Sequence, residues 1–409
     1  MAKNEMTSDG TDVVSSIIEK ATEDLHRRSL HALERAPIND GIQYIKGLQC
    51  DSGGFKLMDE VEATPLMTGY ALLAMGLVGL KIEDPAPAAA INYLKALQHP
   101  SGGIGYYLDS TPSLGPTAVI IQALKQLGTP RSTPLLQSAQ KFISEKLHDG
   151  YWRESSAING KSELGIEVGL TALCASAMKD VLLTSNRESI IKALIASRNH
   201  DGGWGWSTGY ESDVDHTSMA MIAILDLTEA GGIDLPDIKS ALTQGREYIL
   251  SCHQKDGGFT QRGGREGTSS IDASGLAVVA LSKLARPTDE VLRKAAAFFL
   301  RTQNADGGWG DKPGSVSDLD STFFVTHALM QSGETIITLQ EAENSMRGLE
   351  SGLKELFNER ITVVTDERDD IAAELKGIER KVQMLEAAIG IIVTIASILL
   401  AVAGIPGFD

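Results

Sequence analysis

A glycine pair recurs along this chain about every 50 residues, and this repeat constrains the fold more than any other feature. Glycine accepts a positive φ at little cost, so each pair predicts a sharp turn at the same place in a repeated unit. A sixth, degenerate copy has a single glycine. The copies read LQCDSGGF (48–55), LQHPSGGI (97–104), LHDGYW (147–152), SRNHDGGWGW (197–206), CHQKDGGF (252–259) and TQNADGGWG (302–310).

Each copy separates two stretches with helical character. An apolar stretch such as INYLKAL (91–97) precedes the turn, a polar loop of about a dozen residues follows it, and a more apolar helix then begins, as in TAVIIQALKQLG (117–128). A threonine stands at the same distance from the glycine pair in four copies, which suits a helix start. These threonines are Thr68, Thr117, Thr217 and Thr322.

Two helices per repeat, one of them richer in alanine and aliphatic residues, predict two layers with the more apolar helix inside. Six such hairpins over residues 36–333 predict an all-α fold, an (α/α)6 toroid. An open solenoid is the rival, but it would usually need polar capping repeats. Residues 1–35 are expected to add an N-terminal helical extension.

The pattern changes after Gly333. Apolar residues recur in steps of four and three from Phe357 to Ile389, with one polar break at Arg368, and charges fill the positions between them. This heptad seam predicts a coiled-coil stalk over residues 334–386, most simply in a parallel homo-oligomer. The alternative is a helix that packs back on the toroid.

Residues 387–405 contain no charged side chain. A helix of this length is about 28 Å long, enough to cross a hydrocarbon core. The segment therefore predicts a transmembrane helix followed by a short tail, 406–409, with the toroid in the cytoplasm. The alternative is a hydrophobic coiled-coil core that never meets lipid.

Composition narrows the function classes. The formal net charge of −17 argues against a nucleic-acid partner, because such partners need a basic surface. The three cysteines, Cys50, Cys174 and Cys252, form no CxxC pair and no disulfide framework, which fits a reducing compartment.

The glycine-tryptophan repeats resemble those of the squalene-hopene cyclase and protein prenyltransferase superfamily. In its class II terpenoid cyclases an Asp-X-Asp-Asp-Thr motif supplies the proton that starts the reaction. This sequence reads Asp213-Val214-Asp215-His216-Thr217 at that place, so the middle acid is kept and the next aspartate is a histidine. The resemblance implies that Asp215 is the proton donor. From the chemistry of the neighbouring side chains, we expect Asp213 to hold or share the proton and His216 to orient or reprotonate the acid.

The loops of the fifth and sixth repeats resemble those of protein prenyltransferase β subunits. There the resemblance places Arg262 and Arg265 on diphosphate-binding positions, and the DKPG stretch supplies Lys312. Asp272 can be matched to a zinc ligand only across an insertion. Ser274 and Ser321 stand where the zinc cysteine and histidine would be, so no zinc and no thiol prenylation are expected.

Acidic residues gather before the second helix of the last three repeats. They are Asp215, Asp272 and Asp320, with Asp213 and Asp318 two residues earlier. Adjacent repeats are neighbours in a ring, so these carboxylates should share one side of one mouth. A helix N-terminus lowers a carboxyl pKa, whereas burial and like charges raise it. Alternatively, these residues are ordinary helix-start residues, since Asp is a favoured N-cap.

Two functions follow as hypotheses. The first is a membrane-anchored class II-type cyclase of an isoprenoid or prenyl diphosphate, with Asp272, Asp318 and Asp320 at the substrate and Mg²⁺ as a possible bridge to a phosphate. The second is a non-catalytic toroid that binds an isoprenoid or a partner and acts as an oligomeric membrane sensor or scaffold. Aromatic residues make up only 5% of the chain, and the glycine-turn tryptophans are expected to lock repeats together.

Overall fold

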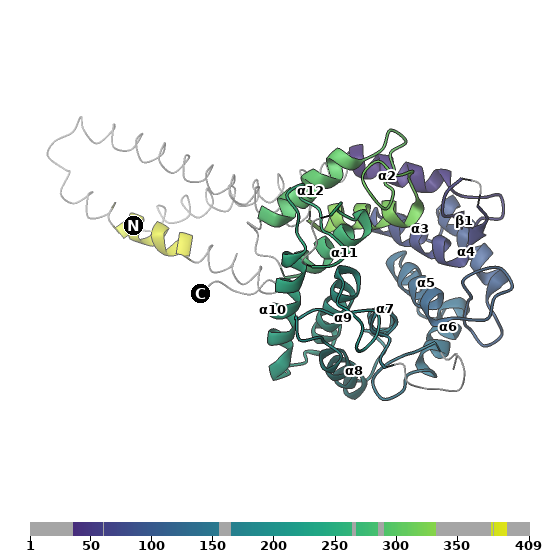
Figure 1. Cartoon of the computed structure of the whole chain (residues 1–409), viewed down its shortest axis with the longest axis horizontal. Helices are drawn as coiled ribbons and strands as arrows, with labels where there is room; N and C mark the ends of the chain where they lie inside the picture. The colour runs from purple at the N-terminus through teal and green to yellow at the C-terminus, as the bar shows by residue number, and fades with distance from the viewer. Residues whose placement is uncertain are drawn as a thin grey trace, which may run out of the picture. The chain divides into compact units, whose positions relative to one another are not determined.

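The computed structural model describes residues 36–59, 61–154, 165–263, 267–284, 290–332, 378 and 380–390. Between residues 36 and 332, helices alternate between an outer and an inner layer around a central axis (Figure 1). The outer helices are α2 (Ala36–Gly47), α4 (Pro85–Leu97), α6 (Pro134–Ser144), α8 (Thr184–Ala196), α10 (Pro236–Ser251) and α12 (Glu290–Thr302). The inner helices are α3 (Pro65–Leu77), α5 (Leu114–Gln126), α7 (Val168–Met178), α9 (Val214–Gly231), α11 (Ile271–Ser282) and residues 319–332.

The sixth repeat joins the first, so the helices form a closed ring. The amide of Leu319 donates to the Leu57 carbonyl at 2.8 Å, and the Tyr44 hydroxyl donates to the Ser317 carbonyl at 2.6 Å. The Gln303 amide also reaches the Pro37 carbonyl of α2, at 2.9 Å. These contacts across the whole sequence confirm the toroid and exclude the open solenoid.

The turn glycines pack against the outer helix of the next repeat. All six have positive φ, between 84° and 92°. A Cβ atom on each would lie 2.1–2.8 Å from a backbone carbonyl oxygen of that helix, closer than real Cβ atoms come. The pairs are Gly53 with Ala89, Gly102 with Ser138, Gly150 with Ser189, Gly202 with Gln244, Gly257 with Lys294, and Gly307 with Asp40. Glycine is therefore needed both for the turn and for the close approach.

A buried hydroxyl fastens each inner helix to its own turn. In the fourth repeat the Thr217 hydroxyl accepts a hydrogen bond from the Trp204 amide at 2.9 Å. The same bond recurs in all six repeats, and the acceptors are Thr68, Thr117, Thr171, Thr217, Ser274 and Thr322. Each acceptor is the fourth residue of its helix, so the prediction that these threonines cap the helix start is wrong. The N-cap lies four residues earlier, as at Thr64 and Asp213.

Three tryptophans lock the hairpins, as the sequence predicts. Trp152, Trp204 and Trp309 are fully buried. Each indole N–H donates to a carbonyl of the outer helix that precedes it, at 2.7–2.9 Å. Trp206 differs, because its side chain is 57% exposed and lies beside His216.

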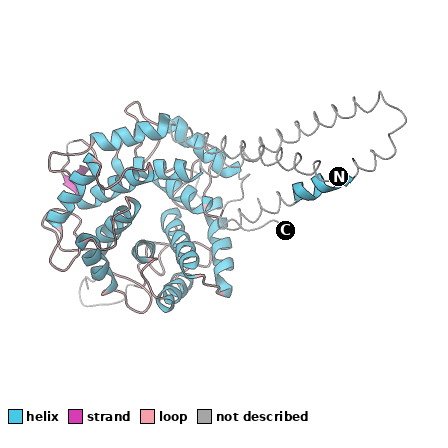
Figure 2. Ribbon diagram, turned by 180° about the vertical axis from the view of Figure 1, so that it is seen from behind, coloured by secondary structure: helices cyan, strands magenta, loops and turns pink. Residues whose placement is uncertain are grey.

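Other segments contribute less. Two short antiparallel strands, β1 (Phe55–Lys56) and β2 (Ala63–Thr64), stiffen the first loop (magenta in Figure 2). Of the predicted tail, residues 380–390 are helical. The N-terminal extension and most of the predicted stalk and transmembrane segment lie outside the described residues. Within the part of the chain that is described, no helix is both long and apolar enough to span a bilayer.

The close approach at the turn predicts that alanine destabilises the protein more at Gly102 than at Gly128. Gly102→Ala places a methyl group 2.1 Å from the Ser138 carbonyl oxygen, whereas Gly128→Ala, also at positive φ, meets nothing within 4 Å. The control should lose about 1–2 kcal/mol of unfolding free energy through its backbone. Gly102→Ala should lose about 1–3 kcal/mol more through the steric clash. Urea denaturation of both variants measures the difference, and equal losses would contradict the close approach.

Candidate active site

The loops between turns and inner helices meet at one end of the ring, here called the mouth. The first amide of an inner helix donates to the loop of the next repeat. Val168 donates to the Trp206 carbonyl at 3.0 Å, and Val214 donates to the Gln261 carbonyl at 2.9 Å. The Ile271 amide likewise donates to the Asp311 carbonyl, and the Leu319 amide donates to the Leu57 carbonyl. The N-termini of these inner helices are therefore held together at the mouth.

On an inner helix, one line, or stripe, of side chains is partly exposed to solvent. The outer layer and the neighbouring inner helices bury the other side chains of that helix. Members are spaced three or four residues apart, so they share one helix face, which must look toward the ring axis. We call these stripes the interior face. They include Leu66, Tyr70, Leu73 and Leu77 on α3, Leu170 and Leu173 on α7, Asp215, Met219 and Ile222 on α9, Asp272 and Leu276 on α11, and Asp320, Phe324 and His327 in the sixth repeat.

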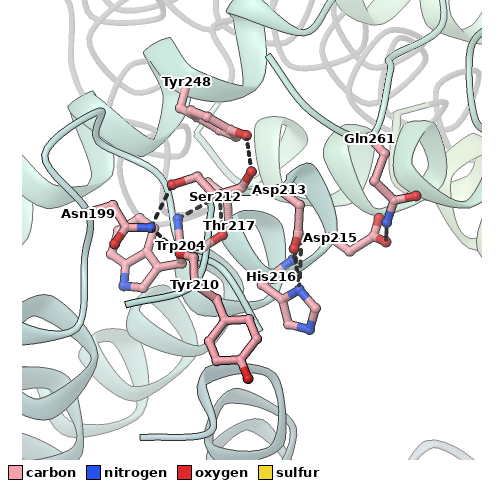
Figure 3. A network of polar contacts seen from close by, with 10 residues as sticks. All are labelled: Asn199, Trp204, Tyr210, Ser212, Asp213, Asp215, His216, Thr217, Tyr248 and Gln261. Atoms are coloured by element: carbon pink, nitrogen blue, oxygen red, sulfur yellow. Dashed lines mark hydrogen bonds and ion pairs between the residues drawn. The ribbon is translucent and has the colours of Figure 1, made fainter. Parts of the chain in front are cut away.

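Asp215 begins the interior face of α9. Its Oδ2 accepts a hydrogen bond from the Gln261 side-chain amide at 2.5 Å, whereas its Oδ1 is buried without a hydrogen-bond partner (Figure 3). Burial raises the pKa of Asp215 to about 7, and the negative charges of Asp213 and Asp272 add to the shift. Burial thus outweighs the helix N-terminus, which alone would favour the ionised form.

The Gln261 contact also fixes the place of the proton. An amide N–H can only donate, so Oδ2 of Asp215 must accept. In the neutral acid the proton therefore resides on Oδ1, the oxygen without a protein partner. Its raised pKa keeps this carboxyl protonated up to about pH 7, so that it holds a proton to donate.

Asp213 and His216 form a pair beside this acid. Asp213 is the N-cap of α9 and accepts from the His216 amide at 2.8 Å. Its two carboxylate oxygens also lie 2.8 Å from Nδ1 of His216 (Figure 3). The His216 ring packs edge-on against Trp206, with ring centroids 5.7 Å apart. The structure thus gathers all three predicted catalytic residues at the first turn of one helix.

A network behind Asp213 holds its loop. The Tyr248 hydroxyl of α10 donates to the Ser212 carbonyl at 2.5 Å, and the Asn199 amide donates to the Ser212 hydroxyl at 2.9 Å (Figure 3). Tyr44 and Asn304 make the same contacts to Ser317 in the sixth repeat. Because it recurs, this network is part of the repeat scaffold, and its role is to position the N-cap aspartates.

The other predicted carboxylates follow in ring order. Burial raises the pKa of Asp272 to about 6, and the charges of Asp320 and Asp311 add to the shift, whereas a hydrogen bond with the Ser321 side chain opposes it. Asp318 is the acceptor for the Ser321 amide at 2.8 Å, and burial together with Asp320 raises its pKa. Electrostatic coupling between neighbours agrees with the prediction that the acids share one side of the mouth.

Two of the predicted basic residues, Arg262 and Lys312, lie on exposed loops. Arg262 pairs with Glu211, Nη1 to Oε2 at 2.8 Å, and Lys312 lies 3.8 Å from Asp311. Arg265 is outside the described residues. Among the residues that the structure describes, no group of three or more His, Cys, Asp or Glu side chains is arranged to hold a metal ion.

Several residues of the site escape sequence reasoning. Gln261 belongs to the loop of the next repeat, and no local signal marks it as the partner of Asp215. Tyr70 of α3 stacks on Phe323, with ring centroids 5.1 Å apart, and lies 5.6 Å from Phe324. Phe298 and Phe299 of α12 are buried in the wall between the layers.

Comparisons with known proteins agree with this architecture. The profile of the prenyltransferase alpha-alpha toroid domain matches residues 25–113 and 119–295, and that of the squalene-hopene cyclase C-terminal domain matches residues 234–365. A drimenyl diphosphate synthase of Streptantibioticus cattleyicolor is 27% identical over 52% of this chain and 40% of its own length. The protein farnesyltransferase β subunit of Pisum sativum is 22% identical over 57% of this chain and 54% of its own length.

Solved structures show the same fold. The type II terpene cyclase MstE from Scytonema, without ligand, has a TM-score of 0.58 at 16% identity and covers 75% of this chain and 99% of its own. A single-residue variant of the same cyclase, in complex with geranylgeranyl dihydroxybenzoate, gives a TM-score of 0.57 at 15% identity. The chain spans less than half the length of the two drimenyl diphosphate synthases that it matches.

The raised pKa of Asp215 predicts how stability depends on pH. An unfolded aspartate has a pKa of about 4, so the folded state, with a pKa of about 7, binds this proton more tightly. The group costs no stability below pH 4, and its penalty grows as the pH rises through 7. Asp215→Asn should therefore raise the melting temperature, relative to wild type, more at pH 8 than at pH 5. Thermal melts test this, and a pH-independent difference would contradict the assigned shift.

Proposed function

This chain belongs to the prenyltransferase alpha-alpha toroid family, and from that premise we propose that it is a class II-type terpene cyclase in which Asp215 protonates an isoprenoid double bond. The observation that carries the proposal is the buried, unpartnered Oδ1 of Asp215 at the head of an apolar interior face. Names of similar proteins, drimenyl diphosphate synthase and type II terpene cyclase, support the reaction class.

The proposed first step moves one proton. The π electrons of a substrate double bond take the proton from Oδ1 of Asp215, which leaves a carbocation and an aspartate. The Gln261 amide, already donating to Oδ2, stabilises the new carboxylate. Attack by a second double bond then closes a ring. Solvent at the mouth restores the proton, and Asp213 and His216 lie beside Asp215 to relay it.

Isoprenoids reach such a site from membranes, and the mouth suits that source. Seven large apolar side chains, each 40–77% exposed, lie on loops that directly precede an inner helix. They are Val61, Tyr106, Tyr107, Leu108, Trp206, Tyr210 and Val316. An apolar rim of this kind favours contact with a lipid-like substrate or a bilayer. A membrane location, with the C-terminal segment as anchor and a homo-oligomeric stalk, remains part of this proposal.

A second candidate is a binding toroid without catalysis. Arg262 pairs with Glu211, and Lys312 lies 3.8 Å from Asp311. These pairs favour the binding toroid, because both basic side chains are already engaged by carboxylates and are not available to a diphosphate. In that case an isoprenoid would occupy the interior face, and binding would be signalled through the tail. Product formation separates the two candidates.

The test is an incubation of detergent-solubilised full chain with farnesyl diphosphate, geranylgeranyl diphosphate and geranylgeranyl dihydroxybenzoate. Each reaction is run with and without Mg²⁺, and extracts are analysed by mass spectrometry. We expect an isomer of one substrate, and at least a 100-fold loss of it in Asp215→Asn, the scale of a general acid. Asp237→Asn, at the same helix position in α10 but exposed, is the matched control and should keep its rate.

Full activity in Asp215→Asn would reject the proposed acid. A folded wild-type protein that binds one of these isoprenoids but forms no product would reject the cyclase in favour of the binding toroid.

Gln261 gives a separate prediction. Its hydrogen bond lowers the pKa of Asp215, so Gln261→Leu should raise that pKa further. The loss of activity on the alkaline side should move to higher pH, while the rate at the optimum falls because the proton is no longer confined to Oδ1. A pH–rate profile measures both effects. An unshifted alkaline limb would show that Gln261 does not act on Asp215.

A further inference from the structure

The interior face of the sixth repeat ends in a histidine that the reaction above does not use. His327 lies on the inner helix of residues 319–332 and is half-buried. It stands seven residues beyond Asp320, so about 10 Å of helix separates it from the acidic mouth. Its position is therefore deep in the ring, on the same axial stripe as the acids.

Aromatic rings lie between the mouth and this histidine. Phe323 is 5.7 Å from the His327 ring and 5.3 Å from Phe324, and Tyr70 stacks on Phe323 and meets Phe324 edge-on. Aromatic faces attract a passing cation. A positive charge formed near Asp215 and moved inward by ring closure would meet this group next, with His327 at its far side.

The charged groups near His327 leave its nitrogens free. Asp226 of α9 is buried and bound by Lys283 at 2.9 Å and by Lys179 at 3.2 Å. No hydrogen bond joins the His327 ring to a residue that the structure describes. Burial lowers the pKa of His327 to about 4, with the Lys283 charge acting the same way and Asp226 opposing it. At neutral pH the imidazole is uncharged and offers a lone pair.

We propose that His327 is the base that ends the cyclisation, taking a proton from the carbon next to the final cation. This inference rests on the proposed function. The C–H bond breaks, its electrons form the product's double bond, and the proton joins a ring nitrogen. Asp226 offsets part of the Lys283 charge that acts on the imidazolium, and the proton then passes to water. The step needs no oxidant and no metal. The substrate gains one proton from Asp215 and loses one proton to His327, so the protons balance.

A merely structural histidine would behave differently. His327 makes no hydrogen bond that holds a neighbour among the described residues, and its ring contact there is with Phe323. Phenylalanine would preserve that packing but cannot accept a proton. The identity of the product, rather than the stability or the rate, therefore distinguishes a catalytic base from a side chain that only packs against Phe323.

The experiment compares His327→Phe and His327→Gln with wild type and with His200→Phe, a control that makes the same substitution at an exposed histidine of the fourth glycine turn. Each full-length protein is given the substrate that wild type converts. Both His327 variants should consume it within about fivefold of the wild-type rate, because Asp215 is intact. The wild-type alkene should fall at least tenfold as a share of product, replaced by other alkene isomers or by alcohols from water capture.

Three outcomes decide the matter. A changed product pattern in both His327 variants, with His200→Phe unchanged, supports the assignment. An unchanged pattern in either folded His327 variant overturns His327 as the base and leaves the proposed function standing. Absence of product from wild type, or full activity in Asp215→Asn, overturns the cyclase and this inference with it.

Discussion

The contact between each turn glycine and a carbonyl of the next outer helix is the constraint on which the rest of the structure depends. Gly307 makes this contact with Asp40, and so the last repeat meets the first in the same way that every repeat meets its successor. Six identical steps close the ring without a special joint. The approach is possible only because no Cβ intervenes, and the positive φ of the turn excludes most other residues.

Closure has a chemical consequence. The turns set where the inner helices begin, and the bonds from Val214 to Gln261 and from Ile271 to Asp311 hold neighbouring N-termini together. Carboxylates at those N-termini are then close enough to raise one another's pKa, and the layers around them limit access of water. Burial dominates at Asp215, so a residue that would be an ordinary ionised helix-start aspartate is still about half protonated at pH 7.

The repeat made the fold readable from sequence, because each glycine turn acts locally. The two layers, the six hairpins and the locking tryptophans follow from it. The spacing located the threonines correctly along the chain, but their predicted role was wrong. Each hydroxyl accepts a hydrogen bond from a backbone amide 13 residues earlier. The equivalent hydroxyls of the third and fifth repeats, Thr171 and Ser274, were not recognised from the spacing. They lie 19 and 15 residues after the amides that they bind.

The site was only partly predictable for a related reason. The Asp-X-Asp-His spacing identified Asp213, Asp215 and His216, which occupy one helix turn. Gln261 and Tyr70 come from other repeats, and their contacts with Asp215 and with Phe323 depend on ring geometry that no local pattern encodes. The predicted stalk and membrane segment lie almost wholly outside the described residues and stay predictions.

The central claim is that burial keeps Asp215 protonated up to about pH 7, so that it can act as the proton donor. Carbon-13 NMR of the aspartate carboxyl carbons, with Asp215→Asn to assign the resonance, measures its titration directly. The account predicts a midpoint of about 7 for Asp215. A midpoint of about 4, the value for an unperturbed aspartate, would mean that the carboxyl is ionised at neutral pH and would contradict its role as the proton donor.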